Sequence, residues 1–326
     1  MNDRAVGLLE QYDIEVHRTG KGRGAILCDT GRGRLIFKEY TGNESKIALQ
    51  NQILRQIETD GNVNVEQIVP NREGSLLVKD NDGISYVLKT WFDGRECNIY
   101  ERSECLEAVR LLARLHNSME KAACSDTIPA ASPDKEYEKH NRELKRVRKF
   151  LARKGQKTIF EISLQNAFDP FLEQAMEVTE EWATYSHLSQ GQPECGCLCH
   201  GDYQYHNIIK SDGSWYIVNF EKCIRDNPIR DLYLLLRKLL EKSSWSIPLG
   251  RELISAYESI RPISAYSRID LYYRLAYPEK FWKIVNFYYN SGKAWIPERN
   301  LEKLNKLLAQ EVQKQAFLEN VFREVG

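Results

Sequence analysis

One stretch, residues 198–231, constrains the fold of this chain more than any other. It reads LCHGDYQYHNIIKSDGSWYIVNFEKCIRDNPIRD. His200-Gly201-Asp202 is followed by four residues and Asn207, then by two short apolar strands on either side of a Ser-Asp-Gly turn, and then by Asn219-Phe220-Glu221. Such turn residues suit a tight hairpin. The pattern predicts a loop that delivers a carboxylate and an amide, followed by a hairpin that returns another polar side chain to the same end.

Phosphoryl transfer requires parts of this kind. In kinases an aspartate accepts the proton of the acceptor hydroxyl, and two further side chains, one of them an asparagine of the same loop, hold metal against the phosphates. Asp202, Asn207 and Asn219 occur in the matching order, and Glu221 is a further oxygen donor if the strand end bends. The alternative is an ordinary loop and hairpin of an unrelated fold. The number of parts that occur in order disfavours it.

The pattern H-G-D-x-x-x-x-N, then strand, turn, strand and N-P-x-x-D-L, resembles the catalytic segment of the aminoglycoside phosphotransferase and choline kinase superfamily. This resemblance implies an α+β, protein-kinase-like two-lobed fold, with a small antiparallel-sheet lobe that carries one main helix and a large, mostly helical lobe. It also implies that Asp202 is the catalytic base, that Asn207 binds metal, and that His200 and Asp231 are structural. The family carries a metal-binding aspartate where this chain has Asn219.

The first ninety residues read as the small lobe of such a fold. Residues 13–40 predict three strands, and a turn that contains Gly20, Gly22 and Gly24 follows the first of them. The backbone N–H groups of this turn can face nucleotide phosphates, and a flexible hairpin tip is an equal alternative. The third strand presents Lys38, and a lysine on this strand pairs with the phosphates in kinase-like folds. We therefore expect ATP as the cofactor, with Mg²⁺ if the protein is active.

The next segments predict a helix and a hinge. Residues 43–58 show the apolar spacing of a helix. Kinase-like folds need an acid here to orient the strand lysine, and the spacing does not choose between Glu44 and Glu58. After two more strands, Trp91 and Phe92 form the predicted hinge and contribute to the nucleotide site. The predicted boundaries are residues 1–92 for the small lobe and 93–326 for the helical lobe, which contains the loop at 198–231.

The remaining chain is mainly helical by its spacing. A strongly basic helix follows Ser132-Pro133-Asp134, and a solvated cationic face is favoured over a docking surface for an acidic partner. Residues 159–187 predict a pair of helices. His116 lies near the end of an earlier predicted helix. For this histidine, a hydrogen-bonded structural role is favoured over a functional one.

The composition of the chain limits the classes of partner that it is expected to bind. Lys plus Arg and Asp plus Glu both number 46, so the formal net charge is zero and gives no general drive towards nucleic acid or anionic membrane. The N-terminus shows no signal peptide, and no apolar run approaches the ~20 residues of a spanning helix. We expect synthesis in the cytoplasm without membrane insertion. Cys195, Cys197 and Cys199 alternate, and reduced thiols are favoured over a zinc site.

A closer resemblance covers the hinge to the C-terminus and, more loosely, the first ninety residues. The segments WFDGRECN, VNFEKC, IRDLYLLLRKLLEK and LAYPEKFWKIVNFYYNSGKAWIPERNLEKL resemble the CotS-type spore coat proteins of endospore-forming bacteria. That family also tends to carry asparagine at the position of Asn219. The resemblance implies a spore coat location, with other coat proteins as partners. It leaves two functions open: an ATP-dependent phosphotransferase acting on a small hydroxylated molecule such as a sugar or amino alcohol, or a non-catalytic coat component that keeps the kinase fold.

Overall fold

The computed structural model describes residues 3–22, 24–121, 133–188, 196–290 and 297–322. It consists of two compact units, and each is described by itself. Unit 1 comprises residues 1–129, 196–235 and 256–261, and unit 2 comprises residues 130–195, 236–255 and 262–326. The predicted lobe boundary at residue 92 falls inside unit 1 and stays a prediction.

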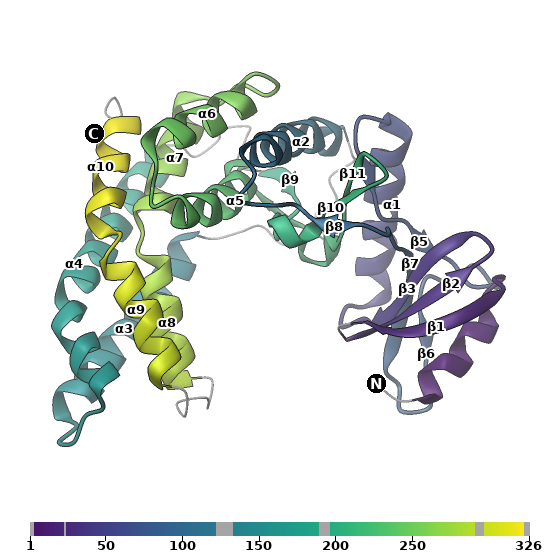
Figure 1. The fold of residues 1–326 in the computed structure, drawn as a ribbon, viewed down its shortest axis with the longest axis horizontal. Helices are drawn as coiled ribbons and strands as arrows, with labels where there is room; N and C mark the ends of the chain where they lie inside the picture. Colours follow the sequence, from purple (N-terminus) through teal and green to yellow (C-terminus); the bar gives the residue numbers. More distant parts are fainter. Residues whose placement is uncertain (1–2, 23, 122–132, 189–195, 291–296, 323–326) are drawn as a thin grey trace. The chain divides into compact units, whose positions relative to one another are not determined.

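An antiparallel sheet forms the N-terminal part of unit 1 (Figure 1). Its strand order is β1-β2-β3-β7-β5, and β6 pairs with β7. The strands are β1 Val16–Gly22, β2 Ala25–Thr30, β3 Gly33–Glu39, β5 Ile68–Val69, β6 Val78–Lys79 and β7 Ser85–Thr90. The three strands expected between residues 13 and 40 are confirmed. The first extends further than predicted, because Gly20 and Gly22 continue the pairing with β2.

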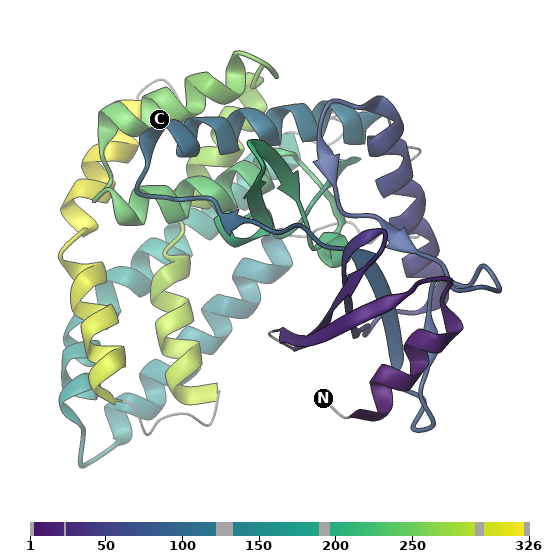
Figure 2. The same ribbon diagram turned by 45° about the vertical axis from the view of Figure 1, so that its right-hand side comes forward.

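Helices complete this part of unit 1. A 3-10 helix, Asp3–Gln11, places Ala5 and Leu9 against Phe37 and Leu88 of the sheet. Helix α1, Glu44–Asp60, lies beside the sheet in Figure 2 and confirms the helix expected at residues 43–58. Its ends have the local signals of a helix: the side chain of the N-cap residue Asn43 accepts a hydrogen bond from the backbone of Lys46, and Gly61 ends the helix at φ 68°.

A second sheet connects the N-terminal segments with the segment that carries the motif. Its order is β4-β11-β10-β8, with bounds Asn64–Val65, Ser214–Ile217, Ile208–Ser211 and Arg95–Glu96. The predicted hairpin is confirmed in β10 and β11, where Asp212 and Gly213 take φ 48° and 78° as a tight turn requires. Around it lie α2 Arg102–Glu120, the pair β9 Cys197–Cys199 and β12 Ile224–Asp226, and α5 Ile229–Lys242.

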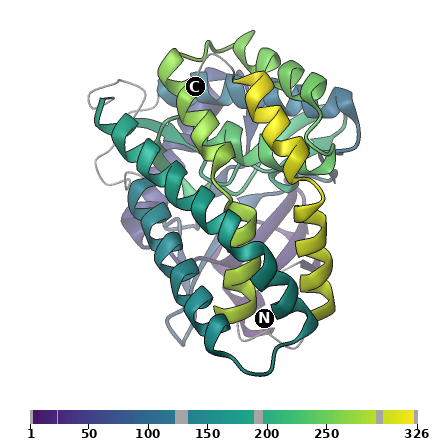
Figure 3. The same cartoon turned by 90° about the vertical axis from the view of Figure 1, so that its left-hand side faces the viewer.

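Unit 2 is built from helices. They are α3 Pro133–Arg153, α4 Ile159–Leu188, α6 Ile247–Glu258, α7 Ala265–Ala276, α8 Glu279–Asn290, α9 Pro297–Leu308 and α10 Glu311–Val321. The last residues of α6 belong to unit 1, and residues 236–242 of α5 belong to unit 2. Helices α3, α4, α8 and α9 pack side by side, and Figure 3 shows the length of α4.

The helix pair predicted for residues 159–187 is wrong. Helix α4 is continuous and contains Pro170. Buried Phe168 and Phe171 on either side of this proline both pack on Phe281 of α8, and this packing holds the helix together despite the hydrogen bond that proline removes.

The strand-rich N-terminal region and the helices that follow confirm the predicted α+β class. Within the described ranges, no helix is both long enough and apolar enough to cross a membrane.

Candidate functional site

The loop after β9 is fixed to helix α5 through Asp231. The backbone N–H groups of His200 and Gly201 donate to the two carboxylate oxygens of Asp231, at 2.7 and 2.9 Å. Gly201 takes φ 81°, and a Cβ at this position would collide with the carbonyl oxygen of Lys222. The loop and the segment after β11 are therefore in backbone contact, which only glycine permits.

Two histidines support this loop. His116 Nε2 lies 3.1 Å from Asp231, and its Nδ1 lies 2.8 Å from the hydroxyl of Tyr257. Burial lowers the pKa of His116, so the ring is neutral, donates to Asp231 and accepts from Tyr257. Burial would raise the pKa of Asp231, but the hydrogen bond from His116 and the backbone donors hold it below its usual value. His200 bonds the carbonyl of Val218 at 3.1 Å.

The carboxylate of Asp202 has a partner on each oxygen. Gln204 Nε2 donates to Oδ1 at 2.7 Å, and Lys222 Nζ contacts Oδ2 at 2.8 Å. The side chain of Asp202 is 18% exposed and that of Lys222 is 67% exposed. A carboxylate at the surface of the site, with an ammonium group beside it, can accept a proton from a hydroxyl once Lys222 moves away.

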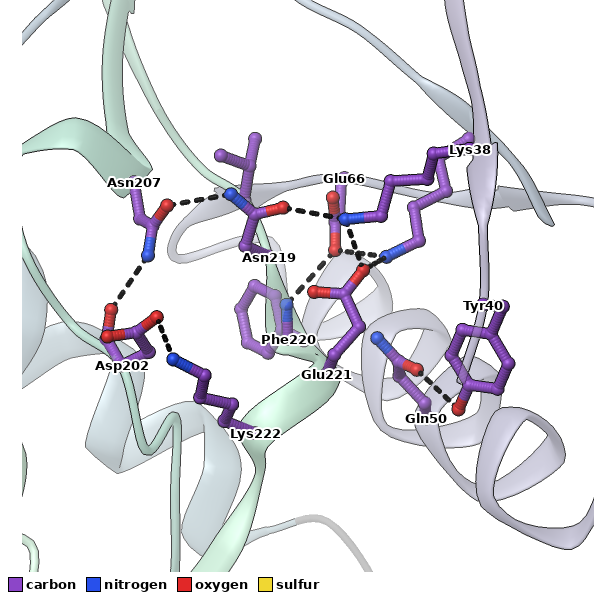
Figure 4. A network of polar contacts seen from close by, with 12 residues as sticks. Lys38, Tyr40, Gln50, Glu66, Asp202, Asn207, Asn219, Phe220, Glu221 and Lys222 are labelled. Carbon is purple, nitrogen blue, oxygen red and sulfur yellow. Dashed lines mark hydrogen bonds and ion pairs between the residues drawn. The ribbon is translucent and has the colours of Figure 1, made fainter. Parts of the chain in front are cut away.

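A chain of hydrogen bonds joins this loop to the N-terminal sheet (Figure 4). Asn207 Nδ2 donates to the carbonyl oxygen of Asp202 at 2.8 Å, and Asn219 Nδ2 donates to Asn207 Oδ1 at 2.7 Å. Asn219 Oδ1 then accepts from Lys38 Nζ at 3.1 Å, across 181 residues of sequence. Asn219 has φ 69° and ψ 58°, a left-handed conformation that asparagine adopts more readily than most residues.

Lys38 belongs to a group of four charged side chains, two of which the sequence analysis missed. Lys38 Nζ lies 2.7 Å from Glu221 Oε1, and Lys89 Nζ lies 2.5 Å from the same oxygen. Lys89 also contacts Glu66 at 3.0 Å, and Glu66 accepts the backbone N–H of Phe220 at 3.1 Å. Figure 4 shows the side chains of Lys38, Glu66 and Glu221 converging. Because Lys38 pairs with Val87 across β3 and β7, Lys38 and Lys89 lie on one face of the sheet.

The two pairs of charges compensate each other. Burial would lower the pKa of the fully buried Lys89, but Glu66 and Glu221 hold it above its usual value. Burial would raise the pKa of Glu221, but Lys89 and Lys38 lower it to about 2. Lys89 and Glu221 therefore form an ion pair at neutral pH.

The acid that orients Lys38 is neither of the two expected on the helix. Glu221, from the segment after β11, contacts Lys38, whereas Glu44 lies 3.6 Å from Lys79. Helix α1 instead turns Gln50 inward, and Gln50 accepts a 3.4 Å hydrogen bond from the hydroxyl of Tyr40. Spacing along α1 could not reveal this, because the partner of Lys38 comes from another part of the chain.

The predicted nucleotide-binding glycines lie close to Lys38 in the sheet. Ala25 pairs with Gly22 on one side and with Lys38 on the other, so the β1–β2 tip and Lys38 occupy the same end. A Cβ at Gly20 or Gly24 would meet open space, and Gly24 has φ 72°.

The predicted hinge lies at the other end of β7. Trp91 donates its backbone N–H to the carbonyl of Arg34, and the ring of Phe92 stacks on Tyr216 at 3.9 Å. A nucleotide role for Trp91, Phe92 or the glycines stays a prediction.

The residues present do not fit Mg²⁺ as they are arranged. The two amide oxygens expected as ligands, Asn207 Oδ1 and Asn219 Oδ1, each already accept a hydrogen bond. Glu221 is neutralised by two ammonium groups, and no cluster of three or more potential ligands occurs among the described His, Cys, Asp and Glu residues. Mg²⁺ favours carboxylate oxygen and tolerates little distortion. A metal role for Asn207, Asn219 and Glu221 stays a prediction.

Of the residues at the site that were not predicted, Lys89 carried a weak sequence signal. Lys89 follows the buried run Tyr86-Val87-Leu88 in β7, and a lysine that continues an apolar run suggests a buried cation. Glu66, Gln204 and Lys222 had no such signal. Cys197 and Cys199 form no disulfide among the described residues, while Cys195 lies outside them.

Comparison with known proteins gives the context for this geometry. The sequence model of a family described as "Spore coat putative kinase YutH" matches residues 6–321. A relative, spore coat protein S of Bacillus subtilis (strain 168), is 22% identical over 308 residues, which cover 92% of this chain and 87% of the relative.

Solved structures share the fold. An aminoglycoside phosphotransferase from Alicyclobacillus acidocaldarius superposes with a TM-score of 0.84 at 19% identity, covering 97% of this chain and 95% of that one. A spectinomycin phosphotransferase in complex with ADP and spectinomycin gives a TM-score of 0.64 at 13% identity, with 94% and 97% covered. At these identities the likeness establishes the kinase-like fold, as the resemblance implied.

Proposed function

Because the chain belongs to the YutH family of spore coat kinase-like proteins, we propose that it is a coat-associated protein that binds ATP without transferring its phosphate. Lys38 and the backbone of the Gly20–Gly24 hairpin hold the phosphates, and Trp91 and Phe92 contact the nucleobase. The protein is made in the cytoplasm and joins the coat through other coat proteins, as the similarity to spore coat protein S suggests.

The observation that carries this proposal is the hydrogen bonding of Asn219. In kinases this position supplies charge for the metal that neutralises the phosphates. Here an uncharged amide lies between Lys38 and Asn207, and hydrogen bonds use both its oxygen and its nitrogen. Lys38 keeps an ammonium group for phosphate, 23% exposed, so phosphate binding needs no metal ion. Asp202 is also held by Lys222, which opposes its use as a base.

Titration calorimetry with ATP tests the proposal. We expect similar affinities in EDTA and in Mg²⁺, and a loss of about tenfold or more in Lys38→Ala, since a charged hydrogen bond contributes about 1.5–3 kcal/mol. Lys79→Ala is the matched control, because Lys79 is an exposed lysine of the same sheet, on β6. The proposal fails if ATP does not bind at millimolar concentrations or if Lys38→Ala binds it normally.

A second function, phosphotransfer to a small hydroxylated molecule such as a sugar or amino alcohol, is favoured by one specific observation. Asn207 bonds the carbonyl of Asp202 in an intact H-G-D-x-x-x-x-N loop, so the loop that carries the base is preserved. Slow ATP turnover that disappears in Asp202→Asn would support this function, because general-base groups typically contribute about 10²–10⁴-fold to rate.

A further inference from the structure

A cavity of about 870 Å³ lies in unit 1 between the first turns of α1 and residues 220–224. Its lining includes Gln50, Lys46 and Glu221. Glu221 is the only one of these three that also belongs to the Lys38 group. The predicted nucleotide-binding glycines and the hinge are not among its lining residues. The cavity therefore does not include the predicted nucleotide contacts, and it adjoins the loop site through Glu221 and through Lys222, the partner of Asp202.

Gln50 places an unpaired hydrogen-bond donor in this cavity. Its side chain is 4% exposed, its Oε1 is held by the Tyr40 hydroxyl, and its Nε2 has no partner among the described residues. Figure 4 shows the nitrogen on the side that faces Glu221, which also lines the cavity, and the oxygen turned towards Tyr40. A buried donor without a partner costs about 1–3 kcal/mol, so such a group calls for an acceptor.

The start of α1 makes the same cavity attractive to a negative charge. Asn43 and Ser45, from the first turn of this 17-residue helix, line it, and the N–H groups of a first turn carry partial positive charge. Lys46 also lines it, is exposed, and has no carboxylate partner among the described residues. Glu221 does not oppose an anion here, because Lys38 and Lys89 neutralise it.

The walls are mainly apolar. Leu49, Ile53, Phe220 and Ile224 contribute to the lining. A single water takes about 30 Å³ of liquid volume, so the cavity is far larger than the water that would satisfy Gln50. An occupant therefore combines an acceptor group at Gln50 and Lys46 with an apolar body against the walls.

We propose that this cavity is a second ligand site, which binds an organic carboxylate with an apolar body. The carboxylate accepts from Gln50 Nε2 and faces Lys46 and the N-terminus of α1. The apolar body packs on Leu49 and Phe220. This site is distinct from the predicted nucleotide contacts, so the two ligands should bind without competing.

Fluorine NMR with 4-(trifluoromethyl)benzoate as the probe tests the proposal on the full chain. We expect the probe to bind, the neutral 4-(trifluoromethyl)benzamide to bind at least about tenfold more weakly, and Gln50→Leu to weaken the probe by about tenfold or more, as loss of a charged hydrogen bond does. Lys46→Gln, a change at an exposed residue that preserves the fold, should weaken it by several-fold. Saturating ATP should not displace the probe.

Gln52→Leu is the matched control, because it makes the same change on an exposed residue of α1 outside the cavity lining. It should leave binding unchanged. The proposal is overturned if the probe does not bind up to its solubility limit, if the benzamide binds equally well, or if Gln50→Leu and Lys46→Gln both bind the probe as the parent does. Displacement by ATP would also overturn it, because the cavity would then belong to the nucleotide site.

Discussion

At the scale of single residues, Asn219 is the link between the N-terminal sheet and the loop that carries Asp202. Its amide is a donor to Asn207 and an acceptor from Lys38, so it closes a hydrogen-bond chain without adding charge. An aspartate at this position would keep the acceptor for Lys38 but could not donate to Asn207. Two oxygens would then face each other where a 2.7 Å hydrogen bond exists now.

We therefore expect Asn219→Asp to lower the melting temperature in EDTA, with a loss of about 1–3 kcal/mol in the free energy of unfolding for the broken, part-buried hydrogen bond. Added Mg²⁺ should restore stability, because a cation between the two oxygens replaces the lost proton. Scanning fluorimetry with and without Mg²⁺ measures both effects. Asn98→Asp is the control, because Asn98 is exposed and its oxygen only accepts from the backbone of Tyr100. This account would be contradicted by a mutant that melts at the parent's temperature in EDTA, or by one whose melting temperature does not rise when Mg²⁺ is added.

Glu221 gives a pH-dependent prediction. Its pKa in the folded chain is about 2, below the ordinary 4.5, because Lys89 and Lys38 outweigh the effect of burial. A depressed pKa adds stability that is complete above pH 4.5 and is lost as the pH falls towards 2. The stability difference between the parent and Glu221→Gln should therefore shrink steadily over this window.

Urea unfolding at a series of pH values measures that difference. Glu44→Gln is the control, because Glu44 is exposed and its 3.6 Å pair with Lys79 is worth little in water. A difference for Glu221→Gln that stays constant from pH 5 to pH 2 would show that Glu221 is not paired as described.

At the scale of elements, the contact between the loop after β9 and the segment after β11 holds the site together. Gly201 and Gly213 both have positive φ, 81° and 78°, but only Gly201 lies against another backbone, at the carbonyl of Lys222. Alanine at either position costs about 1–2 kcal/mol for the left-handed backbone. Gly201→Ala should cost about 1–3 kcal/mol more, the usual range for overpacking.

Urea unfolding of Gly201→Ala and Gly213→Ala measures the cost of overpacking at residue 201. The backbone strain is common to both variants, so the difference between their free energies of unfolding gives this cost. The loop displacement should also weaken the Lys222–Asp202 pair. Equal losses in the two variants would show that residues 201 and 222 can separate without consequence.

The same elements show what a sequence can predict. The loop at residues 200–207 and the β10–β11 hairpin were predictable because their spacing and turn chemistry are local. The partner of Lys38 was not, because periodicity assigns a side chain to a face but does not identify what approaches that face. Strands β4 and β8, two residues each, were missed because only pairing with β11 and β10 defines them. The continuous α4 was missed because packing outweighed Pro170.

At the scale of the whole molecule, the chain order and the compact units do not coincide. Unit 1 takes residues from three separate stretches, and its N-terminal part depends on the second of them, residues 196–235, for completion. Strand β4 pairs in parallel with β11 through Asn64–Tyr216 and Val65–Ile217, and Lys89 receives a carboxylate from Glu221. Residues 1–92 therefore contain a strand whose partner, and a buried lysine one of whose two carboxylate partners, lie more than a hundred residues away.

This arrangement predicts that a fragment of residues 1–92 will not fold alone. Without Glu221, Lys89 keeps only Glu66 as a carboxylate partner. Removal of one partner from a buried ion pair typically costs about 3–5 kcal/mol, which is a large share of the stability of a small domain. Circular dichroism should show no cooperative melt for the fragment. Mixing it with residues 93–326 should restore one, because β11 and Glu221 return. A fragment that melts cooperatively near the temperature of the full chain would instead establish residues 1–92 as an independent lobe.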